Sequence, residues 1–195
     1  MAVSEFLLTK PQDHFSIREI ARQVKIDYKL VHTSVQRLIE RKTIIKKKYG
    51  KTELCGLNLT SANDLILVEQ LRKQYFLEKN LGIKIMMQNI REKSATPYYT
   101  LIIFGSYAKG TAHQSSDLDL LIIVPNQAMI SDLERTIHTI TSISPIKVHL
   151  IIITAADFKE MVEAKEQLNV GKEVIKSHFI VYGAEAYYTL IGDFR

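Results

Sequence analysis

The sequence predicts an α/β protein of the α+β kind, with a helical N-terminal part and a C-terminal sheet covered by helices. Apolar residues recur at helical spacing between residues 16 and 40. Further along, strand-length apolar runs at 99–104, 117–124 and 146–153 alternate with helical stretches, a pattern typical of a sheet with helices packed against it. The 195 residues are 46% hydrophobic and 24% charged, as in globular proteins.

The composition also excludes several classes of protein. No apolar run is longer than a strand, so we expect no membrane contact, and the N-terminus lacks the apolar core of a signal peptide. A single cysteine, Cys55, excludes an internal disulfide and a cysteine-based zinc cluster. Both observations favour a cytoplasmic location.

The positive charge of the chain is concentrated near its beginning. Residues 1–60 carry 12 Lys and Arg against 6 Asp and Glu, whereas residues 61–195 carry 14 against 15. The net charge of +5 therefore comes entirely from the N-terminal third. Such asymmetry indicates a segment that faces nucleic acid.

Two short helices joined by a tight turn are predicted in this basic third. Ser16 and Glu19 form a capping box, which marks a helix start, and Asp27 is placed to cap a second helix after the turn Lys25–Asp27. The second helix would bury Val31, Val35, Leu38 and Ile39. Its opposite face is polar and basic, with Tyr28, Lys29, His32, Thr33, Gln36 and Arg37.

Two β-like runs around Tyr49-Gly50 follow and predict a hairpin with a basic tip. Helices and hairpin together resemble winged helix-turn-helix domains, over about residues 3–58, which implies binding of double-stranded DNA. The contacts to phosphates would come from Lys46, Lys47, Lys48 and Lys51, and those nearest the base edges from Lys29, His32, Thr33, Gln36 and Arg37. RNA binding, or a protein-contact module whose lysines are only solvated, remains an alternative.

We divide the chain into a domain at 1–58, a helical linker at 59–96 and a second domain at 97–195. Thr60 or Ser61 is placed to cap the linker's first helix, expected at 62–80 and followed by a second at 83–93. The first helix has Leu65, Val68, Leu71 and Leu77 on one side. It would serve as a spacer, as a surface for a homodimer, or as both.

The segment from Gly105 to Asp119 is the most informative in the chain. Gly105 and Ser106 end one apolar run and open a short helix, which aims backbone N–H groups at a bound anion. Asp117 and Asp119 stand at i and i+2 of the next run, so their carboxylates share a face and can hold a hard divalent cation. Phosphate binding beside paired carboxylates is what nucleotidyl transfer requires.

This segment resembles the signature of the polymerase-beta-type nucleotidyltransferases, Gly-Ser, ten residues and Asp-x-Asp, above all that of the small prokaryotic members. The resemblance implies a mixed sheet and an NTP substrate. Gly105 and Ser106 would bind the β- and γ-phosphates, and Asp117 and Asp119 would hold Mg²⁺ or Mn²⁺. Lys109 would offset phosphate charge unless it is simply solvated, and Ser116, like Ser115, would cap the turn or act as a ligand.

The chain departs from the family at the third carboxylate, expected on the strand at 146–153. His149 occupies that position, and Lys147 on the same face is the other candidate, whereas Asp157 is more suited to cap the next helix. A neutral imidazole suits Mn²⁺ better than Mg²⁺. Three explanations follow: His149 acts as a ligand or base, another group completes the site, or nucleotide binds without turnover. His178 is expected at an ordinary helix end.

The favoured function is metal-dependent transfer of a nucleoside monophosphate from an NTP to a hydroxyl acceptor by a protein tethered to DNA. Asp117, Asp119 and His149 would be the catalytic residues. The alternative is a DNA-binding regulator, or an antitoxin like some relatives, whose second domain binds nucleotide without turnover. A toxin or a modified protein would then be the partner.

Overall fold

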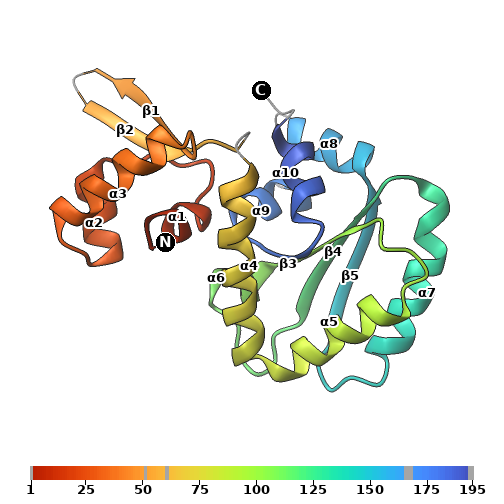
Figure 1. The fold of residues 1–195 in the computed structure, drawn as a ribbon. Helices are drawn as coiled ribbons and strands as arrows, with labels where there is room; N and C mark the ends of the chain where they lie inside the picture. The colour runs from red at the N-terminus through yellow and green to blue at the C-terminus, as the bar shows by residue number, and fades with distance from the viewer. Residues whose placement is uncertain (1, 51, 60–61, 165–168, 193–195) are drawn as a thin grey trace.

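The computed structural model describes residues 2–50, 52–59, 62–164 and 169–192, and the fold is drawn in Figure 1. Lys51, Thr60 and Ser61, for which the sequence predicts roles, lie outside the described residues. No helix within the described ranges is long and apolar enough to cross a membrane. The described chain forms an N-terminal helical unit with a hairpin and a larger α/β unit, with a long helix between them.

The N-terminal unit consists of α1 (Ala2–Leu8), α2 (Ile17–Val24), α3 (Tyr28–Glu40) and a hairpin of β1 (Ile44–Tyr49) and β2 (Thr52–Leu57). The Ser16 hydroxyl accepts the N–H of Glu19 and completes the capping box, and the Asp27 carboxylate accepts the N–H of Lys29. Both caps are where the sequence predicts them. Helix α1 was not anticipated, although its buried Val3 and Leu7 have helical spacing.

Two consecutive helices lead into the sheet, α4 (Ala62–Lys79) and α5 (Leu81–Lys93). In α4 the side chains of Leu65 and Val68 are buried, whereas 36% of the surface of Leu71 is exposed. Phe76 takes the buried position instead and stacks on Phe179 with 4.5 Å between ring centroids. The buried side of α4 therefore includes Leu65, Val68 and Phe76 but not Leu71.

The sheet has the strand order β5-β4-β3-β6, in which β3 is antiparallel to β4 and β6 while β4 and β5 are parallel, so it is mixed as expected. The strands are β3 (Thr100–Phe104), β4 (Leu118–Val124), β5 (Val148–Thr154) and β6 (Phe179–Tyr182). The connecting helices are α6 (Gly105–Lys109), the 3₁₀ helix η1 (Gln127–Met129), α7 (Ile130–Thr141), α8 (Ala155–Glu163), α9 (Val170–Lys176) and α10 (Ala184–Gly192).

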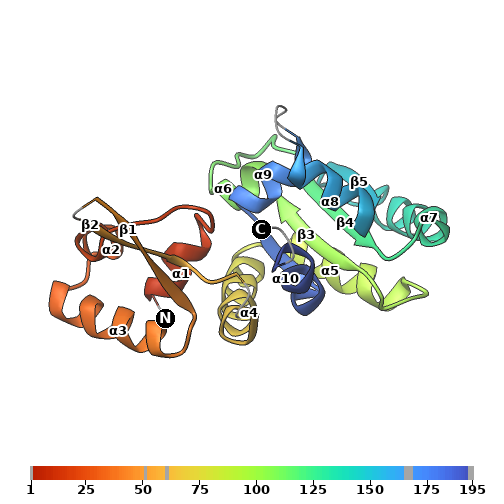
Figure 2. The ribbon, with the colours of Figure 1, turned by 90° about the horizontal axis from the view of Figure 1, so that it is seen from above.

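Helices cover both faces of the sheet, and the alternation of side chains along β4 decides which face each residue joins. Leu118, Leu120 and Ile122 pack with α5 and α7, whereas Leu121 and Ile123 pack with α8, α9 and α10 (Figure 2). Asp119 lies on the second face, since residues 119, 121 and 123 share it. The candidate site therefore opens on the side of α8 and α9.

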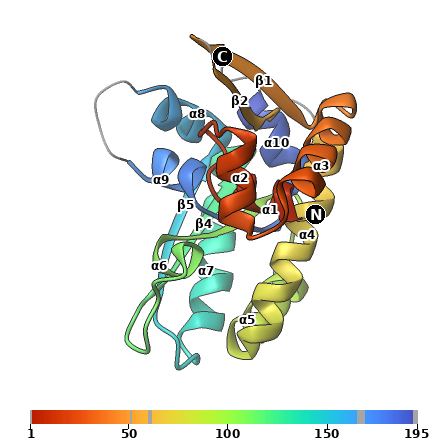
Figure 3. The ribbon, with the colours of Figure 1, turned by 90° about the vertical axis from the view of Figure 1, so that its left-hand side faces the viewer.

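The N-terminal unit is joined to the sheet by a continuous apolar core. Leu7 and Leu8 of α1 belong to the same buried cluster as Leu65 of α4 and Ile191 of α10. Figure 3, which faces the N-terminal unit, shows α1 and α2 in front of the second unit and α4 beside them. The predicted boundary near residue 58 is thus bridged by packing, and the division into three parts remains a prediction.

Candidate functional site

The turn from β3 into α6 depends on glycine at position 105. Gly105 has φ +66°, in the left-handed region that favours glycine. A Cβ atom added there would lie 1.9 Å from Oδ2 of Asp119. The backbone of the turn and the Asp119 carboxylate therefore lie in direct contact, which only a residue without a side chain permits. The two halves of the Gly-Ser and Asp-x-Asp signature meet at this point.

Strand register places Asp119 between one residue of β3 and one residue of β5. It pairs with Phe104 on β3 and with His149 on β5. Nδ1 of His149 lies 3.1 Å from Oδ1 of Asp119, and the two side chains are 61% and 24% exposed. The imidazole thus lies beside the carboxylate and is open to solvent. From this position an imidazole can bind a metal ion or accept a proton. Lys147, two residues earlier, is exposed as well.

Asp117 and the loop before it lead from α6 into β4. Asp117 is exposed and immediately precedes β4. The N–H of His113 donates to Oγ of Ser116, and the Ser116 N–H donates to the His113 carbonyl. Oγ of Ser115 lies 3.0 Å from Nδ1 of His113. These contacts agree with a turn-stabilising role for both serines, and a ligand role for Ser116 stays a prediction.

Lys109, at the other end of α6, has an ionic partner that the sequence reasoning missed. Its Nζ pairs with a carboxylate oxygen of Glu173 on α9 at 2.5 Å, and both side chains remain partly exposed. The two residues are 64 positions apart, so no local pattern would have joined them. Lys109 is therefore held near the Gly-Ser turn.

A metal ion would have to rely on few protein ligands here. Within the part of the chain that the structure describes, no group of three or more His, Cys, Asp or Glu is placed to hold a metal. The Asp157 carboxylate accepts the N–H and the hydroxyl of Thr154 and so caps α8, as expected. Two carboxylates fit Mg²⁺ when substrate phosphates supply further oxygens, which is its common arrangement in proteins.

The basic residues predicted to face nucleic acid lie on α3 and β1. On α3, Lys29, Thr33 and Arg37 are exposed while His32 and Gln36 are half-buried. On the hairpin, Lys47 and Lys48 are exposed, and Lys46 forms a 3.1 Å ion pair with Glu53 across the strands. These side chains are available for contact, although Lys46 would first have to leave its partner.

A buried polar cluster between α4 and the C-terminal helices was also missed. Arg72 donates to Glu69 at 2.9 Å and to the carbonyl of His178 at 3.2 Å, and the Tyr188 hydroxyl donates to Glu69 at 3.1 Å. Burial raises the pKa of Glu69, and burial followed by the nearby Arg72 lowers the pKa of His178 to about 3. His178 does follow the end of α9, as predicted, but its side chain is buried, which the sequence did not indicate.

Comparisons with known proteins agree with the geometry of the second unit. Residues 83–180, about half of the chain, match the family described as nucleotidyltransferase domain. Over 40 residues the chain is 45% identical to a Methanocaldococcus jannaschii protein named "Putative protein adenylyltransferase MJ1305". This match covers 20% of the chain and 27% of that relative's length.

One solved structure, described as "Crystal structure of the toxin-antitoxin with AMP-PNP", is also similar. It is 14% identical with a TM-score of 0.35, over 55% of this chain and 78% of that one. The matched family segment begins within α5 and ends in β6, so it includes residues of all four strands of the sheet and every residue of the Gly-Ser and Asp-x-Asp signature.

Proposed function

The chain belongs to the nucleotidyltransferase domain family, and from this premise we propose that it transfers a nucleoside monophosphate from an NTP to a hydroxyl acceptor. The observation that carries the proposal is the contact between the Gly105 turn and the Asp119 carboxylate, because it joins a phosphate-binding element to an acidic one. In the reaction the acceptor oxygen bonds to the α-phosphorus, the bond to the bridging oxygen breaks, and pyrophosphate leaves. The hydroxyl proton passes to a nearby base.

Each residue of the site has a part in this proposal. Backbone N–H groups at Gly105 and Ser106 bind the terminal phosphates, and Ser116 is a further candidate ligand. Lys109 offsets the charge of the leaving pyrophosphate from its position on α6, provided that Glu173 releases or shares it. Asp117 and Asp119 would hold Mg²⁺ or Mn²⁺. Such an ion neutralises charge on the transferred and departing phosphates.

The test of this function is the metal dependence of NTP binding. We expect the parent protein to bind NTP tightly only with Mg²⁺ or Mn²⁺, and the double variant Asp117→Asn, Asp119→Asn to lose that dependence. Each substitution removes a negative oxygen ligand that hard cations prefer. Isothermal titration calorimetry with and without metal measures the difference, and Asp132→Asn on α7 is a matched control. Equal affinity with and without metal in the parent protein would refute the assignment.

A regulator or antitoxin that binds nucleotide without turnover is the second candidate, because an imidazole stands beside Asp119. The resemblance to the polymerase-beta-type family implies a carboxylate at that position. A protein that is modified or sequestered would then be the partner. The name of the Methanocaldococcus jannaschii relative favours a protein side chain as acceptor in an active enzyme. The two candidates differ in whether His149 supports transfer.

Replacing His149 by aspartate discriminates between these candidates. The variant supplies the missing anion, so Mg²⁺-dependent transfer should appear or rise about tenfold for each 1.4 kcal/mol of transition-state stabilisation. In the parent protein, Mn²⁺ should support more transfer than Mg²⁺, because it accepts imidazole more readily. Labelled NTP incubated with protein and a lysate measures transfer. A parent protein that is fast with Mg²⁺ and slowed by His149→Asp would show that the third ligand lies elsewhere.

We also propose that the N-terminal unit binds duplex DNA as a winged helix-turn-helix domain. Its support is the excess of positive charge in residues 1–60 and the exposure of Lys29, Arg37, Lys47 and Lys48. Phosphate contacts from the hairpin would give affinity without sequence choice, and α3 would enter the major groove.

The triple variant Lys46→Ala, Lys47→Ala, Lys48→Ala tests this second proposal. It should bind all duplex sequences more weakly, and the slope of log K against log salt should flatten by about 0.9 for each phosphate that the hairpin no longer neutralises. A mobility-shift titration at several salt concentrations measures both quantities. Lys159→Ala on α8 is the control for removal of an exposed lysine. If the triple variant keeps the parent's affinity at low salt, the hairpin does not contact DNA.

A further inference from the structure

Strand β5 is an open edge of the sheet. It is the terminal strand in the order β5-β4-β3-β6 and lies beyond β4 in Figure 1. Every residue of β3 is buried, and so is every residue of β4 except Asp119, whereas no residue of β5 is buried. The strand is nevertheless mostly apolar, with the sequence Val-His-Leu-Ile-Ile-Ile-Thr. An apolar strand with a free edge is a template on which another chain can pair.

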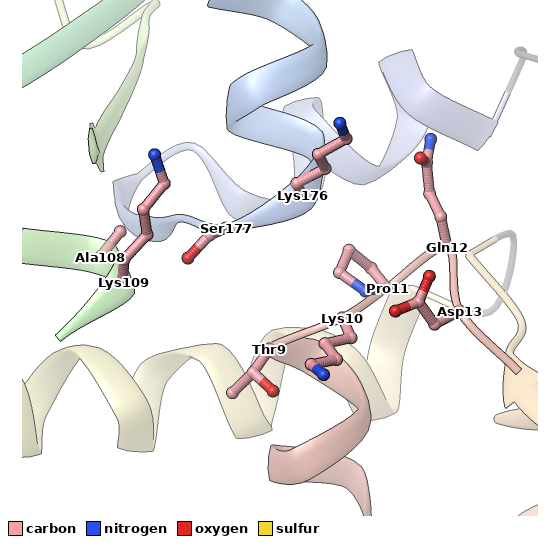
Figure 4. Close-up of a pocket in the computed structure, with 9 residues that line it drawn as sticks. All are labelled: Thr9, Lys10, Pro11, Gln12, Asp13, Ala108, Lys109, Lys176 and Ser177. Carbon is pink, nitrogen blue, oxygen red and sulfur yellow. The ribbon is translucent and has the colours of Figure 1, made fainter. Parts of the chain in front are cut away.

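The opposite edge of the sheet, β6, is covered by α4. Nζ of Lys73 on α4 donates to the carbonyl of Val181 at 3.2 Å, and Phe76 of α4 stacks on Phe179. The N-terminal unit lies on that side as well, where its loop at 9–13 faces the ends of α6 and α9 across a hollow of about 570 Å³ (Figure 4). The fold thus covers one edge of the sheet and leaves the other open.

One hydrogen bond at the start of β5 shows which of its backbone groups face outward. The carbonyl of Lys147 accepts the N–H of Leu118, so the backbone of Lys147 faces β4. Because backbone groups of successive residues point to opposite sides of a strand, those of Val148, Leu150 and Ile152 face away from β4. Among the described residues, no hydrogen bond beyond those of the sheet involves these three. We call their outward N–H and C=O groups the β5 edge.

The β5 edge passes directly beside the candidate site. His149 is the second residue of β5, and its side chain lies on the face where it meets Asp119. A residue of an added antiparallel strand opposite His149 would stand at a position without backbone bonds, where the paired Cα atoms are only about 4.5 Å apart. Its side chain would therefore lie against the imidazole. Two strand spacings, about 10 Å, would separate it from Asp119 on the same face.

Unpaired positive charge lies next to the same point. Lys147 shares a face with His149, is exposed, and has no carboxylate partner among the described residues. An added antiparallel strand would place an acidic side chain opposite Lys147 if that residue came two positions after the one opposite His149. Strand β5 itself contains no acidic residue. Charge complementarity therefore favours a segment of another protein over the β5 strand of a second copy.

We propose that the β5 edge binds an extended segment of another protein as an added antiparallel strand, and that a Ser, Thr or Tyr opposite His149 is the hydroxyl acceptor. The second half of the proposal rests on the proposed function, whereas the first does not. Main-chain hydrogen bonds would give affinity, and an Asp or Glu two residues after the hydroxyl residue would give specificity. The hydroxyl oxygen would bond to the α-phosphorus, pyrophosphate would leave, and the proton would pass to a nearby base.

N-methylated peptides test the docking half without any change to the protein. Labelled peptides as long as β5, with seven residues of alternating β-branched type around a Tyr and a Glu two positions later, are titrated with the full chain by fluorescence anisotropy. N-methylation of both neighbours of the Tyr removes two donors that face β5 and should weaken binding by roughly 5- to 150-fold. N-methylation of the Tyr and of the residue two positions before it is the matched control, because those N–H groups point away.

Two protein variants test the same contacts from the other side. Leu150→Pro removes an outward N–H and keeps the bonds to β4, so it should weaken peptide binding. Lys147→Glu should reverse the preference for a Glu over a Lys in the peptide, with a change of up to about fivefold, as for an exposed ion pair. Lys159→Glu on α8 is the control and should leave that preference unchanged. If Leu150→Pro does not fold, the N-methylated peptides decide alone.

Several results would overturn the proposal. Among them are no peptide binding, equal losses from both patterns of N-methylation, and a dimeric parent protein that Leu150→Pro converts to a monomer, since a second copy would then hold the edge. With labelled Mg²⁺–NTP, the Tyr peptide should be labelled and its Phe analogue should not, and two unlabelled peptides would refute the acceptor role. Calorimetry keeps the proposals apart. A protein that binds NTP but no peptide refutes docking alone, and one that binds the peptide but no NTP refutes nucleotidyl transfer.

Discussion

The Arg72→Ala variant is expected to lose about 3–5 kcal/mol of unfolding free energy at neutral pH, because it leaves the Glu69 carboxylate buried without its counter-ion. The side chains of Arg72 and Glu69 are only 5% and 1% exposed, so water cannot replace the missing partner. The variant also loses the bond to the His178 carbonyl, which ties α4 to the segment before β6. Urea denaturation followed by circular dichroism measures the change in stability.

The penalty should shrink as the pH falls. Burial already raises the pKa of Glu69, and removal of Arg72 raises it further, so protonation neutralises the orphaned carboxylate. The pKa of His178 is lowered from 6.5 to about 3 in the folded protein, first by burial and then by the nearby Arg72. The His178 imidazole therefore contributes a loss of stability as the pH falls from 6.5 towards 3, because the unfolded chain binds that proton more readily, and this contribution should be smaller in the variant.

Arg135→Ala is the matched control for this prediction. Arg135 and Asp132 have the same spacing of three residues on α7, but their side chains are 78% and 72% exposed. An exposed pair contributes about 0–1 kcal/mol, so the control should change stability little at any pH. Similar losses in Arg72→Ala and Arg135→Ala would show that the buried cluster does not hold α4 in place.

Local signals in the sequence predicted most of the fold. The caps at Ser16 and Asp27 are read over three or four residues, and α2 and α3 begin directly after them in the structure. The signature at Gly105 and Asp119 is likewise local. Its resemblance predicted the mixed sheet that the structure has.

What the sequence could not supply are contacts between distant segments. Glu69 and Tyr188 are 119 positions apart, and Lys109 and Glu173 are 64 apart. A buried carboxylate on a helix looks in the sequence like any solvated charge until its partners are known, which is why the cluster around Glu69 was not predicted. Register explains the intermediate case of His149, whose strand position could be predicted but whose 3.1 Å contact with Asp119 could not.

The Gly105→Ala variant is expected to lose roughly 100-fold in nucleotidyl transfer, the effect that displacement of a catalytic group by about 1 Å can have. The added Cβ would lie 1.9 Å from Oδ2 of Asp119, so the carboxylate or the turn must move. Metal-dependent NTP binding should weaken in the same variant. Calorimetry and the transfer assay measure these two effects.

Gly110→Ala separates this steric effect from backbone strain. Gly110 has φ +71°, close to the +66° of Gly105, but a Cβ there meets nothing within 4 Å. Both variants bear the cost of an L-residue in the left-handed region, about 1–2 kcal/mol, and only Gly105→Ala also displaces Asp119. In an Asp119→Ala background the clashing carboxylate is gone, so the stability cost of Gly105→Ala should fall towards that of Gly110→Ala. Equal costs with and without the Asp119 carboxylate would mean that turn and carboxylate are not coupled, and the central observation of the site would lose its functional meaning.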